Sequence, residues 1–146
     1  MISRIKLLVV GKLKRAELKS LVKEYQSKIQ RYIPFEVIEI KDSNKEKEGD
    51  RILEIMQKHN GPKVAFTEDG KSMKSRVFAS QIQEMEGVPL YIIGGPDGID
   101  RRVLNCVNYS ISLSPMTFTH EMAQYLVMEQ IFRAFTIINN TGYHRD

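Results

Sequence analysis

The apolar residues of this chain alternate along its length between two spacings, and this alternation limits the folds open to it. Short runs such as Ile5–Val10 predict buried strands, whereas the stretch from Arg15 to Arg31 repeats its apolar residues every three or four positions and predicts an amphipathic helix. Further strands are predicted at 35–41, 63–67, 88–93 and 109–113, and further helices at 52–59, 75–86, 100–108 and 120–138. Because such alternation produces βαβ crossovers, we expect one α/β domain over residues 1–146, with a mostly parallel sheet and helices on both faces.

The segments between these elements are polar. Residues 42–49 hold no apolar side chain and form either a loop or the exposed start of a helix, and residues 68–71 predict a turn. Residues 139–146 form a polar tail. On the helix predicted at 75–86, we expect four side chains to face the core: Val77, Phe78, Ile82 and Met85.

Composition narrows the class of protein. The longest apolar runs fall far short of the ~20 residues that cross a bilayer, and the first residues lack the apolar stretch of a signal peptide. The single cysteine, Cys106, excludes an intrachain disulfide and is expected to be a small buried side chain. Three widely spaced histidines and one cysteine give no metal-ligand spacing. We therefore expect a cytoplasmic protein without a membrane segment or a metal.

Charge is distributed unevenly along the chain. Residues 1–31 hold nine basic residues against two acidic ones, a net charge of +7, although the whole chain carries only +4. A basic segment on a near-neutral body is typical of a face that binds a polyanion such as nucleic acid. The same lysines also suit a solvated helix surface, and charge alone does not decide between the two.

Ligands of open α/β sheets bind beyond the carboxyl ends of the strands, so the loops after the predicted strands are the candidate sites. The loop Gly94–Gly98 either lets a ligand approach the backbone closely or forms a tight turn, and it matches neither the dinucleotide-binding motif nor the P-loop motif. If it binds a ligand, Gly94→Val should block binding and leave the fold largely intact. The loop Leu113–His120 mixes hydroxyls with Met116 and Phe118, and it suits either an adenine pocket or a helix cap above core residues.

The tail ends in a phenol, an imidazole and a guanidinium, on Tyr143, His144 and Arg145. A stacking ring, a titratable base and a phosphate fork together suit a nucleic-acid site. A frayed terminus is the alternative.

Four segments occur in a characteristic order, namely Ile92–Gly98, Leu113–His120, Glu129–Phe135 and Tyr143–Asp146. With residues 8–14 and 34–40, they closely resemble the bacterial 23S rRNA pseudouridine-N3 methyltransferase family of the SPOUT, or α/β-knot, class over the full length. The resemblance implies a homodimer with a C-terminal trefoil knot that binds S-adenosylmethionine (SAM) at the knot. Two positions depart from the family pattern, because Thr119 stands where proline is common and Gln124 where arginine is common.

Site residues follow from the same resemblance. It implies that the cofactor contacts Phe66, Gly94, Gly95, Leu113, Ser114, Pro115, Met116, Thr117 and Phe118. It implies that the substrate side is formed by His120, Arg133, Tyr143, His144 and Arg145.

The function implied by the resemblance is methylation of N3 of a pseudouridine in 23S rRNA, with assembled ribosomes as the expected form of the substrate. In this hypothesis His144 takes the N3 proton, because its ordinary pKa is nearest to neutrality, Arg133 and Arg145 hold phosphate or the base oxygens, and Tyr143 stacks on the base. The alternatives are a SPOUT enzyme acting on a ribose 2′-hydroxyl or a tRNA base, and an RNA-binding factor without catalysis. The modified nucleotide, the form of the ribosome and the action of the tail in cis or across the dimer stay open.

The predicted C-terminal helix is the expected dimer interface. We expect it to expose more apolar surface than one small sheet covers, through Met122, Leu126, Ile131 and Phe135.

Overall fold

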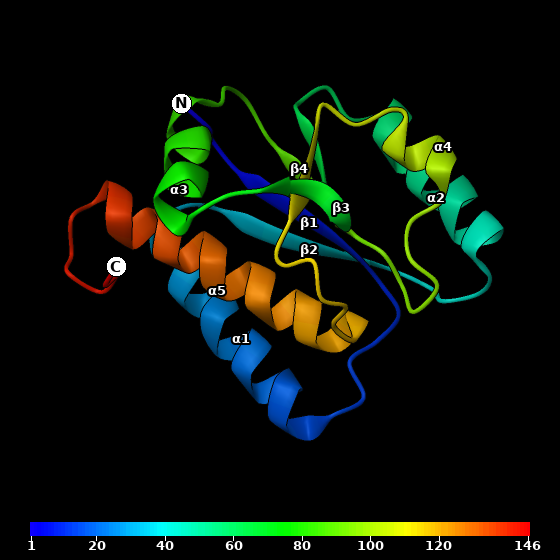
Figure 1. The fold of residues 1–146 in the computed structure, drawn as a ribbon, viewed down its shortest axis with the longest axis horizontal. Helices are drawn as coiled ribbons and strands as arrows, with labels where there is room; N and C mark the ends of the chain where they lie inside the picture. The colour runs from blue at the N-terminus through cyan, green and yellow to red at the C-terminus, as the bar shows by residue number, and fades with distance from the viewer.

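A computed structural model describes all 146 residues, and strands and helices alternate along the whole chain (Figure 1). The strands are β1 (Ile5–Val10), β2 (Phe35–Ile40), β3 (Lys63–Ser72), β4 (Leu90–Ile93) and β5 (Tyr109–Ser112). The helices are α1 (Ala16–Gln30), α2 (Lys45–Gln57), α3 (Ser75–Glu84), α4 (Arg101–Leu104) and α5 (His120–Ile138). The predicted α/β alternation is confirmed.

All strands lie in one sheet with the order β2-β1-β4-β3-β5, and every pairing is parallel. Two of the three inner strands, β1 and the central β4, are almost continuous apolar runs, and all four residues of β4 are buried. A parallel strand is buried on both faces, because its crossover helices cover the sheet from both sides.

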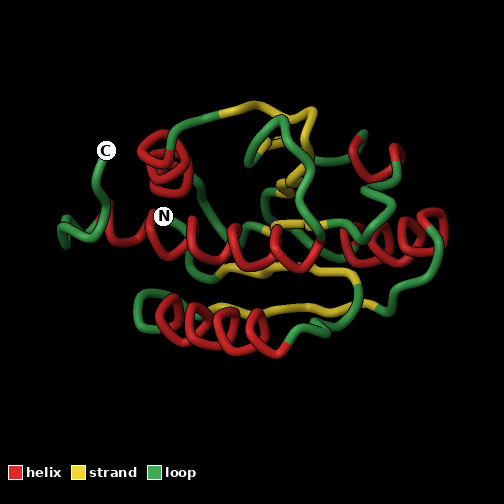
Figure 2. Tube along the Cα trace, turned by 60° about the horizontal axis from the view of Figure 1, so that its bottom comes forward, coloured by secondary structure: helices red, strands yellow, loops and turns green.

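Helices cover both faces, as predicted (Figures 1 and 2). α1, α3 and α5 pack on one face over a core that includes Val22, Ile82 and Ile131, and α2 and α4 pack on the other over Leu8 and Ile92. None of the five helices is both long and apolar enough to cross a bilayer.

The turn predicted at residues 68–71 is wrong, because β3 continues to Ser72. Its register against β5 shifts between Phe66 and Lys71, and both of these residues pair with Ile111. The extension passes so close to β5 that a Cβ on Gly70 would lie 2.6 Å from the carbonyl carbon of Ile111. A glycine inside a strand often marks such a close approach of two backbones. In this sequence the residues beside Gly70 are typical of a turn, so the strand is not evident from them.

The structure corrects two smaller expectations and decides between the two alternatives for a third. Val77 is half exposed, because the inward face of α3 is formed by Phe78 and Ile82. Cys106 is exposed, since α4 ends before it. The segment 42–49 is mainly the start of α2, whose first turn is capped by the side chain of Asn44. The trefoil knot concerns the threading of the chain and stays a prediction.

His59 joins the end of α2 to the segment that leads into β4. Its Nε2 donates to the carbonyl oxygen of Val88 at 2.6 Å. Burial lowers the pKa of His59, the Val88 hydrogen bond opposes this in part, and the charges of Lys6 and Lys63 lower it further. The folded state therefore binds a proton on His59 less readily than the unfolded state does.

Because this pKa is depressed, the free energy of unfolding should fall as the pH drops through the ordinary histidine value of 6.5. We expect His59→Gln, which keeps an N–H donor, to lose less stability than the parent between about pH 7.5 and about pH 5.5. Urea unfolding at both pH values measures this, with His120 and His144 unchanged in both proteins. An equal loss in the two proteins would assign the pH dependence to other groups.

Candidate functional site

Three neighbouring cavities open beyond the carboxyl ends of β3, β4 and β5, and Phe66 and Phe118 line all three. Their volumes are about 620, 250 and 70 Å³. The largest falls within the size range of small-molecule sites, and it lies at the edge of the sheet where ligands of this fold class bind.

The loop Gly94–Gly98 forms one wall of the largest cavity. The loop also closes on itself, because the amide of Gly98 donates to the carbonyl oxygen of Gly95 at 3.0 Å. A Cβ on Gly94 would lie 2.7 Å from Cγ1 of Ile99 and 2.8 Å from the carbonyl carbon of Gly98. The tight turn and the cavity wall are therefore one structure, and the expectation that Gly94→Val leaves the fold largely intact is wrong, because the added side chain would force this loop to move.

The layer formed by α2 and α4 supports this loop from the other side. The buried Glu48 accepts a hydrogen bond from the amide of Ser43 at 2.8 Å, and a Cβ on Gly95 would lie 3.2 Å from its Oε1. Asp100 caps α4 by accepting from the amide of Arg102, whose guanidinium lowers the pKa of Asp100 through hydrogen bonds. Glu48 thus packs closely against Gly95, and Asp100 fixes the start of α4 just after the loop, and the apolar pattern of the sequence indicates neither contact.

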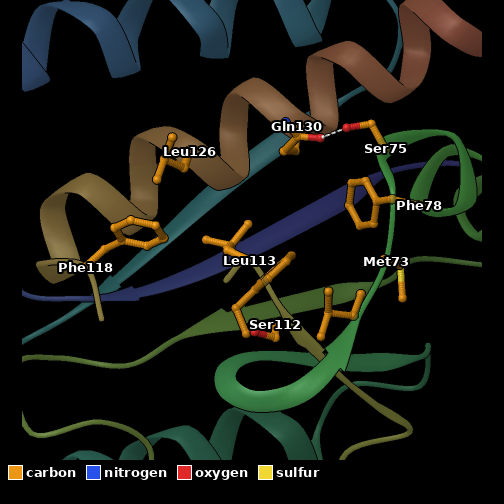
Figure 3. A pocket seen from close by; sticks show the side chains of 10 residues that line it. Met73, Ser75, Phe78, Ser112, Leu113, Phe118, Leu126 and Gln130 are labelled. Atoms are coloured by element: carbon orange, nitrogen blue, oxygen red, sulfur yellow. Dashed lines mark hydrogen bonds between the residues drawn. The ribbon is translucent and has the colours of Figure 1, made fainter. Parts of the chain in front are cut away.

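The 250 Å³ cavity lies between α5, α3 and β5 (Figure 3). Phe78 and Met73 lie on one side of it, and Leu113 and Phe118 lie on the other. Ser112 is 4% exposed, and its Oγ has no hydrogen-bond partner in the chain. A buried hydroxyl without a partner is costly, so a polar ligand atom in this cavity would satisfy it.

Eight of the nine expected cofactor residues line at least one cavity, namely Phe66, Gly94, Gly95, Leu113, Ser114, Met116, Thr117 and Phe118. Pro115 lines none of the three. Sequence reasoning missed Thr67 and Glu68, which line two of the cavities. They follow Phe66 directly at the end of the predicted strand, so the rule that places ligands beyond strand ends would have included them.

The tail is anchored by side-chain contacts, so of the two alternatives the structure does not support a frayed terminus. After α5 the chain turns back, with Asn140 and Gly142 in the left-handed region at φ 56° and 83° (Figures 1 and 2). The hydroxyl of Tyr143 donates to Oε2 of Glu129 at 2.8 Å, and its ring packs edge-on against Phe132 with the centroids 5.0 Å apart.

A closed set of hydrogen bonds joins α3, α5 and the tail, and we call it the tail ring. Its members are Ser75, Arg76, Glu129, Gln130, Arg133, His144 and Asp146. Arg133 donates to Glu129 at 2.7 Å and to Nδ1 of His144 at 3.0 Å. Nε2 of His144 contacts Oδ1 of Asp146 at 3.0 Å, and Arg76 donates to both oxygens of that carboxylate at 2.9 and 3.0 Å.

The ring closes through two further bonds. Ser75 donates to Gln130 at 2.7 Å, and Gln130 donates to Glu129 at 3.2 Å. Ser75 and Gln130 also line the 250 Å³ cavity, so the tail ring borders the candidate site.

These contacts determine where Arg133, Tyr143 and His144 of the tail carry protons. Hydrogen bonds to Glu129 raise the pKa of Arg133, and burial, followed by bonds to Tyr25 and Glu129, raises the pKa of Tyr143 well above its ordinary value. A guanidinium can only donate, so Nδ1 of His144 accepts and Nε2 carries a hydrogen. His144 therefore presents a donor here, and its one lone pair is engaged by Arg133.

The five expected substrate-side residues fall in two places. His120 lines the largest cavity at the start of α5, whereas Arg133, Tyr143 and His144 gather near its end. At 1.5 Å per residue, about 20 Å of helix separates His120 from Arg133. Arg145 is exposed and makes no hydrogen bond or ion pair within the chain. One chain thus does not bring all five together.

The chain is similar to known proteins over nearly all of its length. The family described as "Predicted SPOUT methyltransferase" matches residues 3–144. Proteins named ribosomal RNA large subunit methyltransferase H are 36% identical in Parabacteroides distasonis, over 98% of this chain and 99% of that protein, and 35% identical in Parasynechococcus marenigrum, over 98% and 97%. The solved structure of a probable methylase family protein from Haemophilus influenzae Rd KW20 has a similar fold, with a TM-score of 0.59, 12% identity, and coverage of 99% of this chain and 70% of that one.

Proposed function

Because the chain belongs to the SPOUT methyltransferase family, we propose that it methylates 23S ribosomal RNA at N3 of a pseudouridine, with SAM as the methyl donor. The observation that carries the proposal is the match to proteins named ribosomal RNA large subunit methyltransferase H, at about 35% identity over nearly the whole of both chains. The basic segment supports it, because Lys12, Lys19 and Lys23 are exposed on and before α1, where they suit an RNA backbone.

The lining of the cavities fits SAM. Phe66 and Phe118 offer apolar surfaces for an adenine ring, and the carboxylate of Glu68 suits the positively charged sulfonium and amino groups. The unpartnered Oγ of Ser112 offers a further polar contact. When bound, SAM supplies an electrophilic methyl group, and the reaction needs no further donor.

Phe118→Ala should weaken SAM binding by about tenfold or more, since it removes an apolar wall shared by all three cavities. Phe118 is 39% exposed, so its truncation should change the unfolding temperature little. Isothermal titration calorimetry measures the affinity. Tyr109→Ala is the matched control, because Tyr109 is an exposed aromatic residue that lines none of these cavities. Equal SAM affinities in the two variants would move the cofactor elsewhere.

The reacting N3 lies between two carbonyl groups, and loss of its proton places negative charge on their oxygens. Arg133 and Arg145 hold these oxygens or a neighbouring phosphate, where their donors stabilise that charge. Tyr143 stays protonated on Glu129 and offers its ring for stacking. His144 takes the proton at Nδ1 after Arg133 has moved from that atom to the substrate. His120 positions the substrate from the cofactor cavity.

A chain that ends at Gly142 should bind SAM normally and lose methyl transfer, because the cavities do not include the tail. His144→Ala should lower the rate by about 10²–10⁴, the usual contribution of a positioned acid–base group. Transfer of labelled methyl from SAM to ribosomes measures both effects, and SAM affinity serves as the control for folding. Wild-type rates in the truncated chain would remove the tail from the mechanism.

We propose a homodimer built on the first half of α5. The earlier expectation needs correction here, because Ile131 is fully buried and Phe135 is 8% exposed within one chain. Of the four expected residues, Met122 is exposed and Leu126 is half-buried. Leu126 lies midway between His120 and Arg133, so an antiparallel pair of α5 helices crossing there would bring His120 beside Arg133 of the partner subunit.

Met122→Glu should convert this dimer to a monomer, because it places a charge in the apolar contact. Light scattering at micromolar concentration measures the mass. Val77→Glu is the control, since Val77 is a half-exposed apolar residue on α3, away from this contact. A wild-type chain that is monomeric would contradict the proposal.

A further inference from the structure

The tail ring contains an anion-binding arrangement in which Arg76 and Asp146 have no role in the proposed chemistry. Nε of Arg76 donates to both carboxylate oxygens of Asp146, at 2.9 and 3.0 Å, and Nε2 of His144 contacts the same carboxylate at 3.0 Å. A planar guanidinium binds two oxygens of a phosphate in the same way that it binds a carboxylate. The side chain of Asp146 thus occupies a place that suits an RNA phosphate.

The surroundings of this carboxylate are positively charged. Arg76 and the exposed Lys74 lie at the start of α3, which has no acidic residue in its first turn and no side-chain cap. The positive end of a helix dipole favours an anion there. Arg145, beside Asp146 in sequence, is exposed and unpaired. Asp146 pairs with Arg76 among these cations, and Lys74 and Arg145 have no carboxylate partner.

The pair is open to exchange. The side chains of Arg76 and Asp146 are 57% and 69% exposed, and exposed ion pairs contribute little net stability. Solvent reaches both partners, so a phosphate can approach without unfolding the chain. The pKa of Asp146 is lowered, first by the hydrogen bond from Arg76, so the carboxylate is charged at neutral pH and competes as an anion.

We propose that Arg76, together with Nε2 of His144, forms a phosphate-binding site for the rRNA backbone, and that Asp146 occupies this site in the free enzyme and is displaced when the substrate binds. The inference rests on the proposed function, since the ligand is the backbone of that same substrate. It adds Arg76, a residue outside the resembling segments, to the substrate-binding surface. It also gives Asp146 a role as an internal competitor.

The test measures binding of the full-length enzyme to purified ribosomes at several salt concentrations and constant magnesium. Arg76→Gln should weaken binding about tenfold and reduce the slope of log affinity against log salt by about 0.7–0.9, the value for one lost phosphate contact. Arg76→Lys keeps the charge but lacks the planar guanidinium. Its affinity for ribosomes should lie between those of the parent and of Arg76→Gln. Arg51→Gln is the matched control, because Arg51 is an exposed arginine on α2, on the opposite face of the sheet.

The Asp146→Asn variant distinguishes competition between the Asp146 carboxylate and RNA phosphate from a purely structural role of Asp146. Asparagine keeps an acceptor for His144 but removes the charge, so this variant should bind ribosomes more tightly than the parent. In the double variant with Arg76→Gln the gain should disappear, because the competition acts through Arg76. SAM affinity should be unchanged in all variants and reports that each has folded.

Three results would overturn the inference. They are an unchanged affinity and slope in Arg76→Gln, weaker binding in Asp146→Asn, and a gain that persists in the double variant. Failure of the proposed function looks different, because the parent itself would then neither bind ribosomes nor methylate rRNA. In that case the proposed phosphate-binding site is overturned together with the proposed function.

Discussion

Burial of the central strands on both faces is the constraint on which the rest of the structure depends. β1 and β4 carry apolar residues on both sides, so each must be covered by helices from above and below. The strands of this sheet pair in parallel, so the carboxyl ends of β3, β4 and β5 lie at one edge. The loops after these strands then surround the three cavities, and Phe66 and Phe118 meet there although 52 positions separate them in the sequence.

Much of this arrangement is predictable from local sequence, because burial imposes a regular period. The limits of α5 and the position of the Gly94–Gly98 loop follow from the apolar spacing and from the rule for ligand sites. The extension of β3 past Glu68 could not be predicted, since it depends on contact between Gly70 and the distant β5. Likewise, whether Ile131 and Phe135 face a partner or the core depends on how α5 lies between α1 and α3, which its own period does not indicate.

The polar contacts of the site were the least predictable, because they join residues far apart in sequence. Glu129 accepts from Gln130 and Arg133 on its own helix and from Tyr143 in the tail. It lies largely buried, with 13% of its side chain exposed, so these donors must compensate its charge. The family resemblance indicated that Arg133 and the tail belong to the substrate side, but only the structure identifies the carboxylate that holds them together.

The closed turn at Gly94–Gly98 has a thermodynamic consequence for whatever binds beside it. Its internal hydrogen bond and its support from Glu48 hold the backbone in one conformation within the free chain. A ligand that enters the cavity therefore orders little additional backbone, and little of its contact energy is spent on lost conformational entropy. The conformation of this wall is thus established during folding, in part by the packing of Glu48 of α2 against Gly95.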